Sequence, residues 1–267
     1  MKLRELWARK VTADRSDFWR WVYAAGFVLF ATWGATWVPA VCLAQVWEVE
    51  AKVQDRNVVL LHGLGRSRAN MLILKWRLEA RGYDVCNIGY DTRVDSIEVA
   101  SDGVFDSLVD CLDPRKPVHF VTHSLGGLVL RSLLDRHDGI EGGRAVMLAP
   151  PNRGSEIADW LRAFPITDGL LGDLAGQLGT RREDLPQYLP SPSIPFGVIA
   201  GDRWINPVGR WLLPAPHDGT VSVASTRLDG MSDHLVLPYT HTFIMNAAEV
   251  AVQIDTFLRS GQFDRER

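Results

Sequence analysis

Short apolar runs alternate with amphipathic segments through most of this chain of 267 residues. Short apolar runs between turn-forming residues are typical of buried strands, and the amphipathic segments are long enough to be crossover helices. This alternation indicates an α/β fold, with a mostly parallel sheet and helices on both faces. The predicted strands are 58–62, 83–89, 118–122, 144–149, 196–200 and 234–238, and the predicted helices are 69–81, 97–112, 125–136 and 243–259.

A basic segment followed by a long uncharged run opens the chain. Residues 1–20 carry six basic and three acidic side chains, and residues 21–47 carry no charge. About 20 apolar residues span a bilayer, so the uncharged run is long enough to cross one. Its length and its flanking tryptophans favour an uncleaved transmembrane signal anchor, whereas Pro39 and Ala44 also fit a signal peptide cleaved near Ala44. Either way, the basic amino side places the following domain outside the cytoplasm, membrane-bound or secreted.

Residues 48–267 form one predicted α/β domain, because chains of this size and class commonly remain single. Its longest interruption, residues 155–195, falls between the fourth and fifth strands and is the expected cap over the site. We expect this segment to be either a mobile lid that excludes water or a fixed packing helix. The apolar face predicted for that helix consists of Leu170, Leu171, Leu174 and Leu178, with glycines interleaved that weaken it.

Ser124 stands between a predicted strand and a predicted helix. The strand 118–122 leads into it, and Gly126 and Gly127 follow it on the first turn of the helix. Such a sharp strand-to-helix turn holds a serine clear of the sheet and aims backbone N–H groups beside it, as an acyl-transfer nucleophile requires. Thr122 replaces the first glycine of the G-x-S-x-G pattern. Because threonine is larger and β-branched, we expect the packing of the helix against the strand to adjust locally. Ser124 is therefore the candidate nucleophile.

An upstream loop supplies a second part of the site. The strand 58–62 ends in His62-Gly63-Leu64-Gly65, where a backbone N–H can join the one that follows the nucleophile. We expect the N–H groups of Leu64 and Leu125 to form the oxyanion hole, each stabilising the transition state by about 2.7–4 kcal/mol. A dinucleotide-binding loop of the form G-x-G-x-x-G is excluded, because Arg68 occupies its third glycine position.

The candidate acid and base follow Ser124 along the chain. Asp218 lies in a His-Asp-Gly turn, and His241 comes after the last predicted strand. The order serine, acid, histidine is that of α/β-hydrolases and differs from the order in two unrelated protease folds. In this arrangement the histidine takes the serine proton, and the carboxylate fixes the tautomer of the imidazole.

Other acids and histidines compete for these roles. Asp202 also follows an apolar strand and is the alternative acid, although the Asp-Gly turn favours Asp218. His234 falls within a strand pattern, so we expect a core or edge histidine. We expect His123 to shape the turn at the serine and His62 to brace the oxyanion loop.

With these motifs together, the chain resembles a bacterial lipase or esterase of the α/β-hydrolase superfamily over residues 57 to about 260. The resemblance implies a catalytic triad of Ser124, Asp218 and His241, no cofactor, and a small-molecule or lipid ester as substrate. An acyltransferase or an amidase with the same triad remains an alternative, as does a hydrolase-fold protein that only binds a lipid or a partner. The matching motifs are His62-Gly63-Leu64-Gly65, Thr122-His123-Ser124-Leu125-Gly126-Gly127, residues 149–155, Asp218-Gly219-Thr220-Val221 and His241.

Charge and cysteine content narrow the function further. The formal net charge is −3, and because residues 1–20 are basic the remainder is more acidic still, which argues against nucleic-acid binding. No pair of cysteines has the spacing of a zinc site, so no metal is predicted. Cys86 and Cys111 are the thiols outside the uncharged run, and either a disulfide between them or two free thiols is compatible with export.

Overall fold

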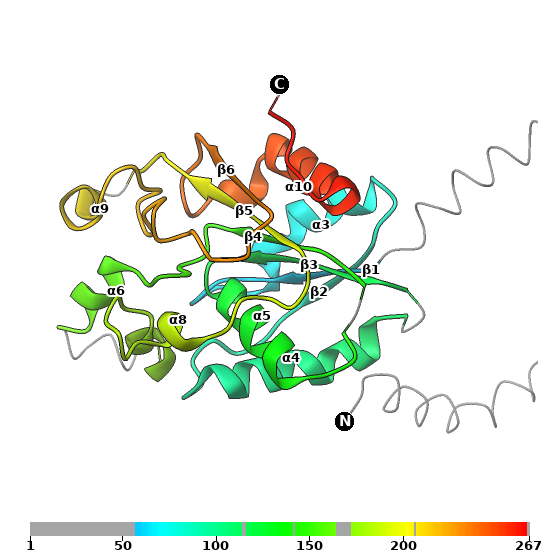
Figure 1. Ribbon diagram of the computed structural model, residues 1–267, viewed down its shortest axis with the longest axis horizontal. Helices are drawn as coiled ribbons and strands as arrows, with labels where there is room; N and C mark the ends of the chain where they lie inside the picture. The colour runs from blue at the N-terminus through cyan, green and yellow to red at the C-terminus, as the bar shows by residue number, and fades with distance from the viewer. Residues whose placement is uncertain (1–56, 114–115, 141, 164–171, 206, 266–267) are drawn as a thin grey trace, which may run out of the picture.

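The computed structural model describes residues 57–113, 116–140, 142–163, 172–205 and 207–265 (Figure 1). The predicted basic segment and membrane anchor lie outside these described residues. Within the described part of the chain, no helix combines the length and the apolar character needed to cross a bilayer.

Six parallel strands form one sheet in the order β2-β1-β3-β4-β5-β6. The strand order reverses at β1, which pairs with β2 on one side and with β3 on the other. Ligands of open α/β sheets bind outside the carboxyl ends of the strands at such a switch point. The strands are β1 (Asn57–Leu61), β2 (Asp84–Ile88), β3 (Val118–His123), β4 (Ala145–Leu148), β5 (Phe196–Gly201) and β6 (Asp233–Leu237).

Helices cover both faces of the sheet (Figure 1). Helices α4 (Ile97–Cys111) and α5 (Leu125–Arg136) cover one face, and α3 (Leu72–Glu79) and α10 (Ala248–Ser260) cover the other. Alternate side chains of a strand point to opposite faces, so a strand covered on both sides is apolar throughout. In β1, for example, Val59 and Leu61 join one core cluster, and Val58 and Leu60 join the other. The predicted α/β architecture with a parallel sheet is thereby confirmed.

The boundaries of two predicted helices differ from the structure. The helix predicted over 69–81 begins as a 3-10 helix, η1 (Arg68–Met71), before α3. The helix predicted over 243–259 divides into η3 (Ile244–Asn246) and α10, because the backbone of Ala247 is extended, with φ −73° and ψ 138°. Ile244 and Met245 are buried in the core, so the apolar pattern continues across the break and conceals it.

The described residues between 155 and 195 contain three short helices. They are α6 (Glu156–Leu161), η2 (Asp173–Gln177) and α8 (Leu185–Tyr188). The prediction that Leu174 and Leu178 share an α-helical face is wrong, because Leu174 belongs to the 3-10 helix η2 and Leu178 follows it. Gly172 begins η2 at φ 79°, a conformation that glycine favours, and a Cβ there would come within 2.6 Å of the Arg93 Cα. Leu170 and Leu171 lie outside the described residues.

A disulfide joins Cys86 of β2 to Cys111 at the end of α4. The two cysteines are therefore paired, and the bond ties a strand near one edge of the sheet to the helix packed against it. Disulfides persist in oxidising compartments and are rare in the cytosol.

Arg131 of α5 is buried and has no carboxylate partner among the described residues. Its guanidinium donates hydrogen bonds to the carbonyl oxygens of Pro190 (3.0 Å), Pro186 (3.1 Å), Asn152 (3.3 Å) and Leu189. Burial lowers the pKa of Arg131 to about 10, so the group stays charged at neutral pH. Arg131 thus anchors the last part of residues 155–195, which leads into β5.

Substitution of Arg131 by methionine is expected to lower the free energy of unfolding by about 3 kcal/mol or more. The change leaves several buried carbonyl groups without donors, at about 1–3 kcal/mol each before any relaxation. Chemical denaturation measures the effect, and Arg136→Met on the same helix is the matched control. Arg136 forms an exposed ion pair with Asp102 at 3.0 Å, which contributes at most about 1 kcal/mol. Equal losses in the two variants would contradict the anchoring role of Arg131.

Candidate active site

Ser124 occupies a strained turn between β3 and α5. Its backbone has φ 53° and ψ −123°, a region that non-glycine residues rarely adopt, and its N–H donates to the Leu148 carbonyl at 2.9 Å. The turn packs tightly against β1 and the loop that follows it. A Cβ at Gly126 would lie 2.7 Å from the Leu61 carbonyl oxygen, and one at Gly63 would lie 3.0 Å from the Ser124 Cβ. A side chain is therefore not accommodated at Gly126, after the serine, and is tightly restricted at Gly63, in the loop that faces it.

Thr122, which replaces the usual glycine, fits because Gly127 faces it. The Thr122 side chain is fully buried, and its hydroxyl has no hydrogen-bond partner in the described structure. A Cβ built at Gly127 would lie 3.5 Å from the Thr122 hydroxyl oxygen. The space left by a second glycine on α5 thus accommodates the larger residue on β3.

The structure brings Asp218 and His241 into direct contact. His241 Nδ1 lies 2.7 Å from Asp218 Oδ2, and the His241 N–H donates to the Asp218 carbonyl at 3.0 Å. The Asp218 side chain is buried, and its Oδ1 accepts the N–H groups of Thr220 at 2.9 Å and Val221 at 2.8 Å. A carboxylate can only accept, so this network assigns the imidazole proton to Nδ1. His241 Nε2 is then free to act as a base.

The alternative acid and the alternative histidine lie elsewhere. The Asp202 N–H donates to the Leu237 carbonyl at 3.2 Å, and the side chain lies 3.8 Å from Arg203 in a partly exposed ion pair. His234 of β6 pairs through Nε2 with the Thr226 hydroxyl at 2.9 Å, and burial lowers the pKa of this histidine to about 4. Neither Asp202 nor His234 lines the cavity at Ser124.

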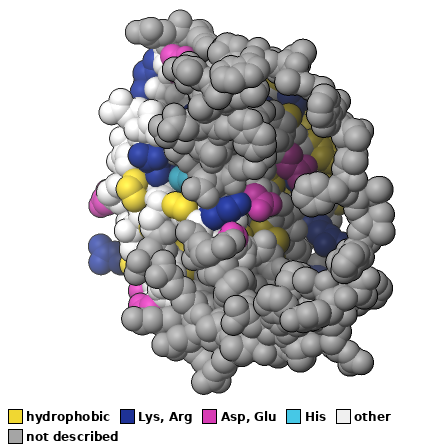
Figure 2. Space-filling view, turned by 90° about the vertical axis from the view of Figure 1, so that its right-hand side faces the viewer, with side chains coloured by type: hydrophobic (Ala, Val, Ile, Leu, Met, Phe, Trp, Pro, Cys, Tyr) yellow, Lys and Arg dark blue, Asp and Glu magenta, His cyan; other side chains and the backbone are white. Residues whose placement is uncertain are grey.

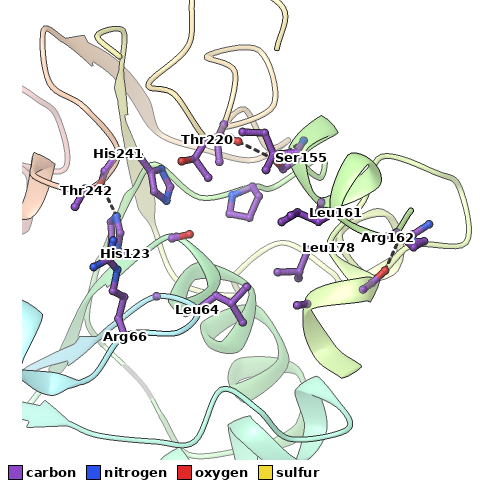
Figure 3. A pocket seen from close by; sticks show the side chains of 18 residues that line it. Leu64, Arg66, His123, Ser155, Leu161, Arg162, Leu178, Thr220, His241 and Thr242 are labelled. Atoms are coloured by element: carbon purple, nitrogen blue, oxygen red, sulfur yellow. Dashed lines mark hydrogen bonds between the residues drawn. The ribbon is translucent and has the colours of Figure 1, made fainter. Parts of the chain in front are cut away.

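His123 supports the backbone of His241. The buried His123 ring donates from Nε2 to the His241 carbonyl at 2.9 Å, and the two ring centroids lie 4.8 Å apart (Figure 3). Burial is the main cause that lowers the pKa of His123 well below its usual value, so the ring is neutral. The prediction that His123 shapes the turn is extended by this contact, because the residue also fixes the loop of His241.

The loop after β1 is braced by His62 and Thr92. His62 Nδ1 donates to the Gly63 carbonyl at 3.0 Å, and its ring stacks on Tyr90 with centroids 4.4 Å apart. The Gly65 N–H donates to the Thr92 hydroxyl at 3.1 Å. The bracing role predicted for His62 agrees with these contacts, whereas Tyr90 and Thr92 carry no motif that identifies them in the sequence.

The backbone N–H groups of Leu64 and Leu125 remain available to a ligand. Neither has a hydrogen-bond acceptor among the described residues. Leu64 lines the cavity, and Leu125 directly follows Ser124 at the start of α5. Two free N–H groups beside a serine are the arrangement that stabilises an oxyanion.

A cavity of about 210 Å³ joins these groups (Figure 3). Ser124 and His241 lie in its wall with Thr220 and Thr242, while Leu161 and Leu178 contribute an apolar wall from residues 155–195. Ser155 links the two sides, because its hydroxyl donates to the Thr220 carbonyl at 2.7 Å. The cavity therefore has a reactive polar side and an apolar side.

Metal sites and charged surfaces do not stand out in the described part of the protein. No group of three or more histidine, cysteine, aspartate or glutamate side chains is arranged to hold a metal ion among the described residues. On the face in Figure 2, the described basic and acidic side chains are interspersed in small groups.

Comparisons with known proteins support the fold. No protein-family model matches the chain, and no curated protein matches it. Among solved structures, the mature lipase BlEst2 of Bacillus licheniformis is 20% identical with a TM-score of 0.64, covering 76% of this chain and 91% of the lipase. A metagenomic carboxyl esterase is 18% identical with a TM-score of 0.56, covering 72% of this chain and 66% of the esterase.

A third structure widens the range of chemistry found on this scaffold. Tomato methylketone synthase I complexed with 2-tridecanone is 12% identical with a TM-score of 0.51, covering 76% of this chain and 97% of the synthase. These likenesses establish that the chain has the α/β-hydrolase fold, which it shares with lipases and esterases. At such low identity they establish the fold alone, so function rests on the site.

Proposed function

We propose that the protein is a serine hydrolase of the lipase or carboxylesterase type that cleaves carboxylic esters through an acyl-enzyme on Ser124. One observation carries the proposal. His241, which is paired with the buried Asp218, lines the same cavity as Ser124, a serine held at a strained strand-to-helix turn. These three groups correspond to the nucleophile, base and orienting acid of a serine hydrolase triad.

The proposed reaction follows from the hydrogen bonds of the site. His241 Nε2 takes the proton of Ser124 as its oxygen attacks the ester carbonyl carbon, and Asp218 stabilises the imidazolium. The N–H groups of Leu64 and Leu125 hold the oxyanion. The intermediate collapses when His241 gives its proton to the leaving alcohol. Water then attacks the acyl-enzyme, with His241 again as base, and releases the acid and free Ser124.

The apolar wall of the cavity supports an acyl chain as the part of the substrate that is buried. Ile157, Leu161 and Leu178 would contact it, and residues 155–195 would act as the cap. The hydrogen bond from Ser155 to the Thr220 carbonyl connects this cap to the loop of Asp218.

A chain-length series of p-nitrophenyl esters tests the proposal on the purified protein. We expect hydrolysis with a burst of p-nitrophenol, because the acyl-enzyme forms before water resolves it. Added alcohols or amines that capture the acyl group faster than water would identify an acyltransferase instead, and anilides with the same acyl groups would reveal an amidase. Absence of turnover with every ester and anilide would contradict the proposal.

We further propose that residues 21–47 anchor the enzyme in the membrane, with the hydrolase domain outside the cytoplasm. The disulfide between Cys86 and Cys111 supports an oxidising compartment. A reporter fused after Arg267 is expected to be active only outside the cytoplasm, and carbonate washing is expected to leave the full-length protein in the membrane. Cytoplasmic reporter activity would contradict the orientation, and release of a shortened protein would indicate cleavage near Ala44.

A further inference from the structure

Among the residues that the structure describes, two arginines and no acidic side chain line the cavity at Ser124. Arg66 and Arg162 are its charged lining residues, whereas the carboxylate of Asp218 lies behind His241. Whether this cavity favours an anionic substrate depends on whether either arginine is already neutralised.

Arg162 is neutralised by carboxylates of the same segment. Its guanidinium lies 2.7 Å from Asp184 and 3.9 Å from Asp159, and it also donates to the Gly176 carbonyl. Arg162 stands beside Leu161 on the apolar side of the cavity. Its charge is thus satisfied within the protein, and its role is to hold α6 against η2.

Arg66 is not neutralised in this way. It has no ion-pair partner among the described residues, and its side chain is exposed at the cavity. Its backbone is nevertheless fixed, because the Arg66 N–H donates to the Gly63 carbonyl at 3.2 Å and closes the turn that presents Leu64. A guanidinium that stands beside the reacting groups and has no carboxylate partner there can pair with an anion through two parallel hydrogen bonds.

The position of Arg66 assigns the anion to one end of the substrate. Figure 3 shows Arg66 next to His123, across the cavity from Leu161, Leu178 and Arg162. The apolar side accepts the acyl chain in the proposed reaction, so the leaving alcohol lies toward His241, which protonates it. Arg66 stands on that side.

We infer that the alcohol part of the substrate carries an anionic group, a phosphate or a carboxylate, which Arg66 binds. This inference rests on the proposed function and specifies its substrate class. Phosphate and carboxylate share the geometry that a guanidinium recognises with two parallel hydrogen bonds, so both are included. Neutral esters of the same acyl group are then the poorer substrates.

Matched esters with one acyl chain measure this preference. We compare 1-decanoylglycerol with 1-decanoylglycerol 3-phosphate and with the decanoyl ester of glyceric acid. The wild-type kcat/KM is expected to be about tenfold or more higher for at least one of the anionic esters. The stronger of the two identifies the anion, and the advantage is expected to shrink at high salt because exposed charges are screened.

Arg66→Gln separates charge recognition from a structural role, because only the ratio between anionic and neutral esters is used. We expect that ratio to fall to about one, chiefly through a higher KM for the anionic ester, and Arg66→Lys to restore part of it. Arg68→Gln, an exposed arginine two residues away that does not line the cavity, is the matched control and is expected to keep the wild-type ratio.

Two results would overturn different parts of the account. A wild-type ratio near one, or a ratio that Arg66→Gln leaves unchanged while esters are hydrolysed, would overturn the anion inference and leave the hydrolase proposal intact. Hydrolysis of none of the three esters, together with no labelling of Ser124 by a fluorophosphonate, would overturn the proposed function itself.

Discussion

Ser124→Ala is expected to lower kcat for an ester substrate by about 10⁶-fold, the size of effect seen when a serine protease loses its nucleophile. The substitution removes the oxygen that forms the acyl-enzyme, so His241 has no serine hydroxyl to deprotonate. The fold is expected to persist, because the Ser124 side chain makes no capping hydrogen bond to α5. Single-turnover kinetics and thermal unfolding of the same samples measure the two expectations.

Ser107→Ala is the matched control for this variant. Ser107 lies on α4, where its hydroxyl donates to the Gly103 carbonyl at 2.9 Å, and it does not line the cavity at Ser124. The control is expected to turn over ester at the wild-type rate. Comparable turnover in Ser124→Ala and in the control would mean that another residue is the nucleophile.

Asp218→Asn is expected to lower kcat by about 10⁴-fold, as the same change does in a protease triad. The structure supplies the reason. The N–H groups of Thr220 and Val221 both donate to Oδ1, so the oxygen of an asparagine is held there and its NH₂ group faces His241 Nδ1. The imidazole must then accept at Nδ1 and carry its proton on Nε2, where a base is needed. A pre-steady-state ester assay measures the loss.

Asp202→Asn is the matched control for the acid. Asp202 forms a partly exposed ion pair with Arg203 and does not line the cavity, so the variant is expected to keep its turnover. The reverse pattern, with Asp202→Asn inactive and Asp218→Asn near normal, would move the acid to the end of β5. Unfolding temperatures of both variants separate this outcome from a simple loss of stability.

The sheet could be predicted from the sequence because most of its strands contain a short apolar run between turn-forming residues, although β6 begins with Asp233 and His234. The break at Ala247 could not, since Ile244 and Met245 continue the apolar pattern and only the tertiary fold decides where the helix restarts. The short helices within residues 155–195 could not be predicted either, because tertiary packing decides where they begin and end. Leu174 and Leu178 pack into the core between glycines, one within the 3-10 helix η2 and the other after it, so they do not share an α-helical face.

The candidate site could be predicted where the order of residues along the chain, or residues typical of turns, indicate it. Ser124 stands out because a strand, a serine and two glycines occur together, and Asp218 because Asp-Gly marks a turn. The choice between Asp218 and Asp202 depends on which carboxylate reaches His241, and sequence spacing alone does not determine that. The buried contacts of Arg131 and the open position of Arg66 depend on the fold in the same way.

Labelling by a fluorophosphonate, followed by mass spectrometry of the digested protein, tests the central proposal most directly. The account predicts one adduct per chain, on the peptide that contains Ser124, and no adduct in Ser124→Ala or in protein unfolded before labelling. An adduct on a different serine, or folded wild-type protein that hydrolyses esters yet stays unmodified, would contradict an acyl-enzyme on Ser124.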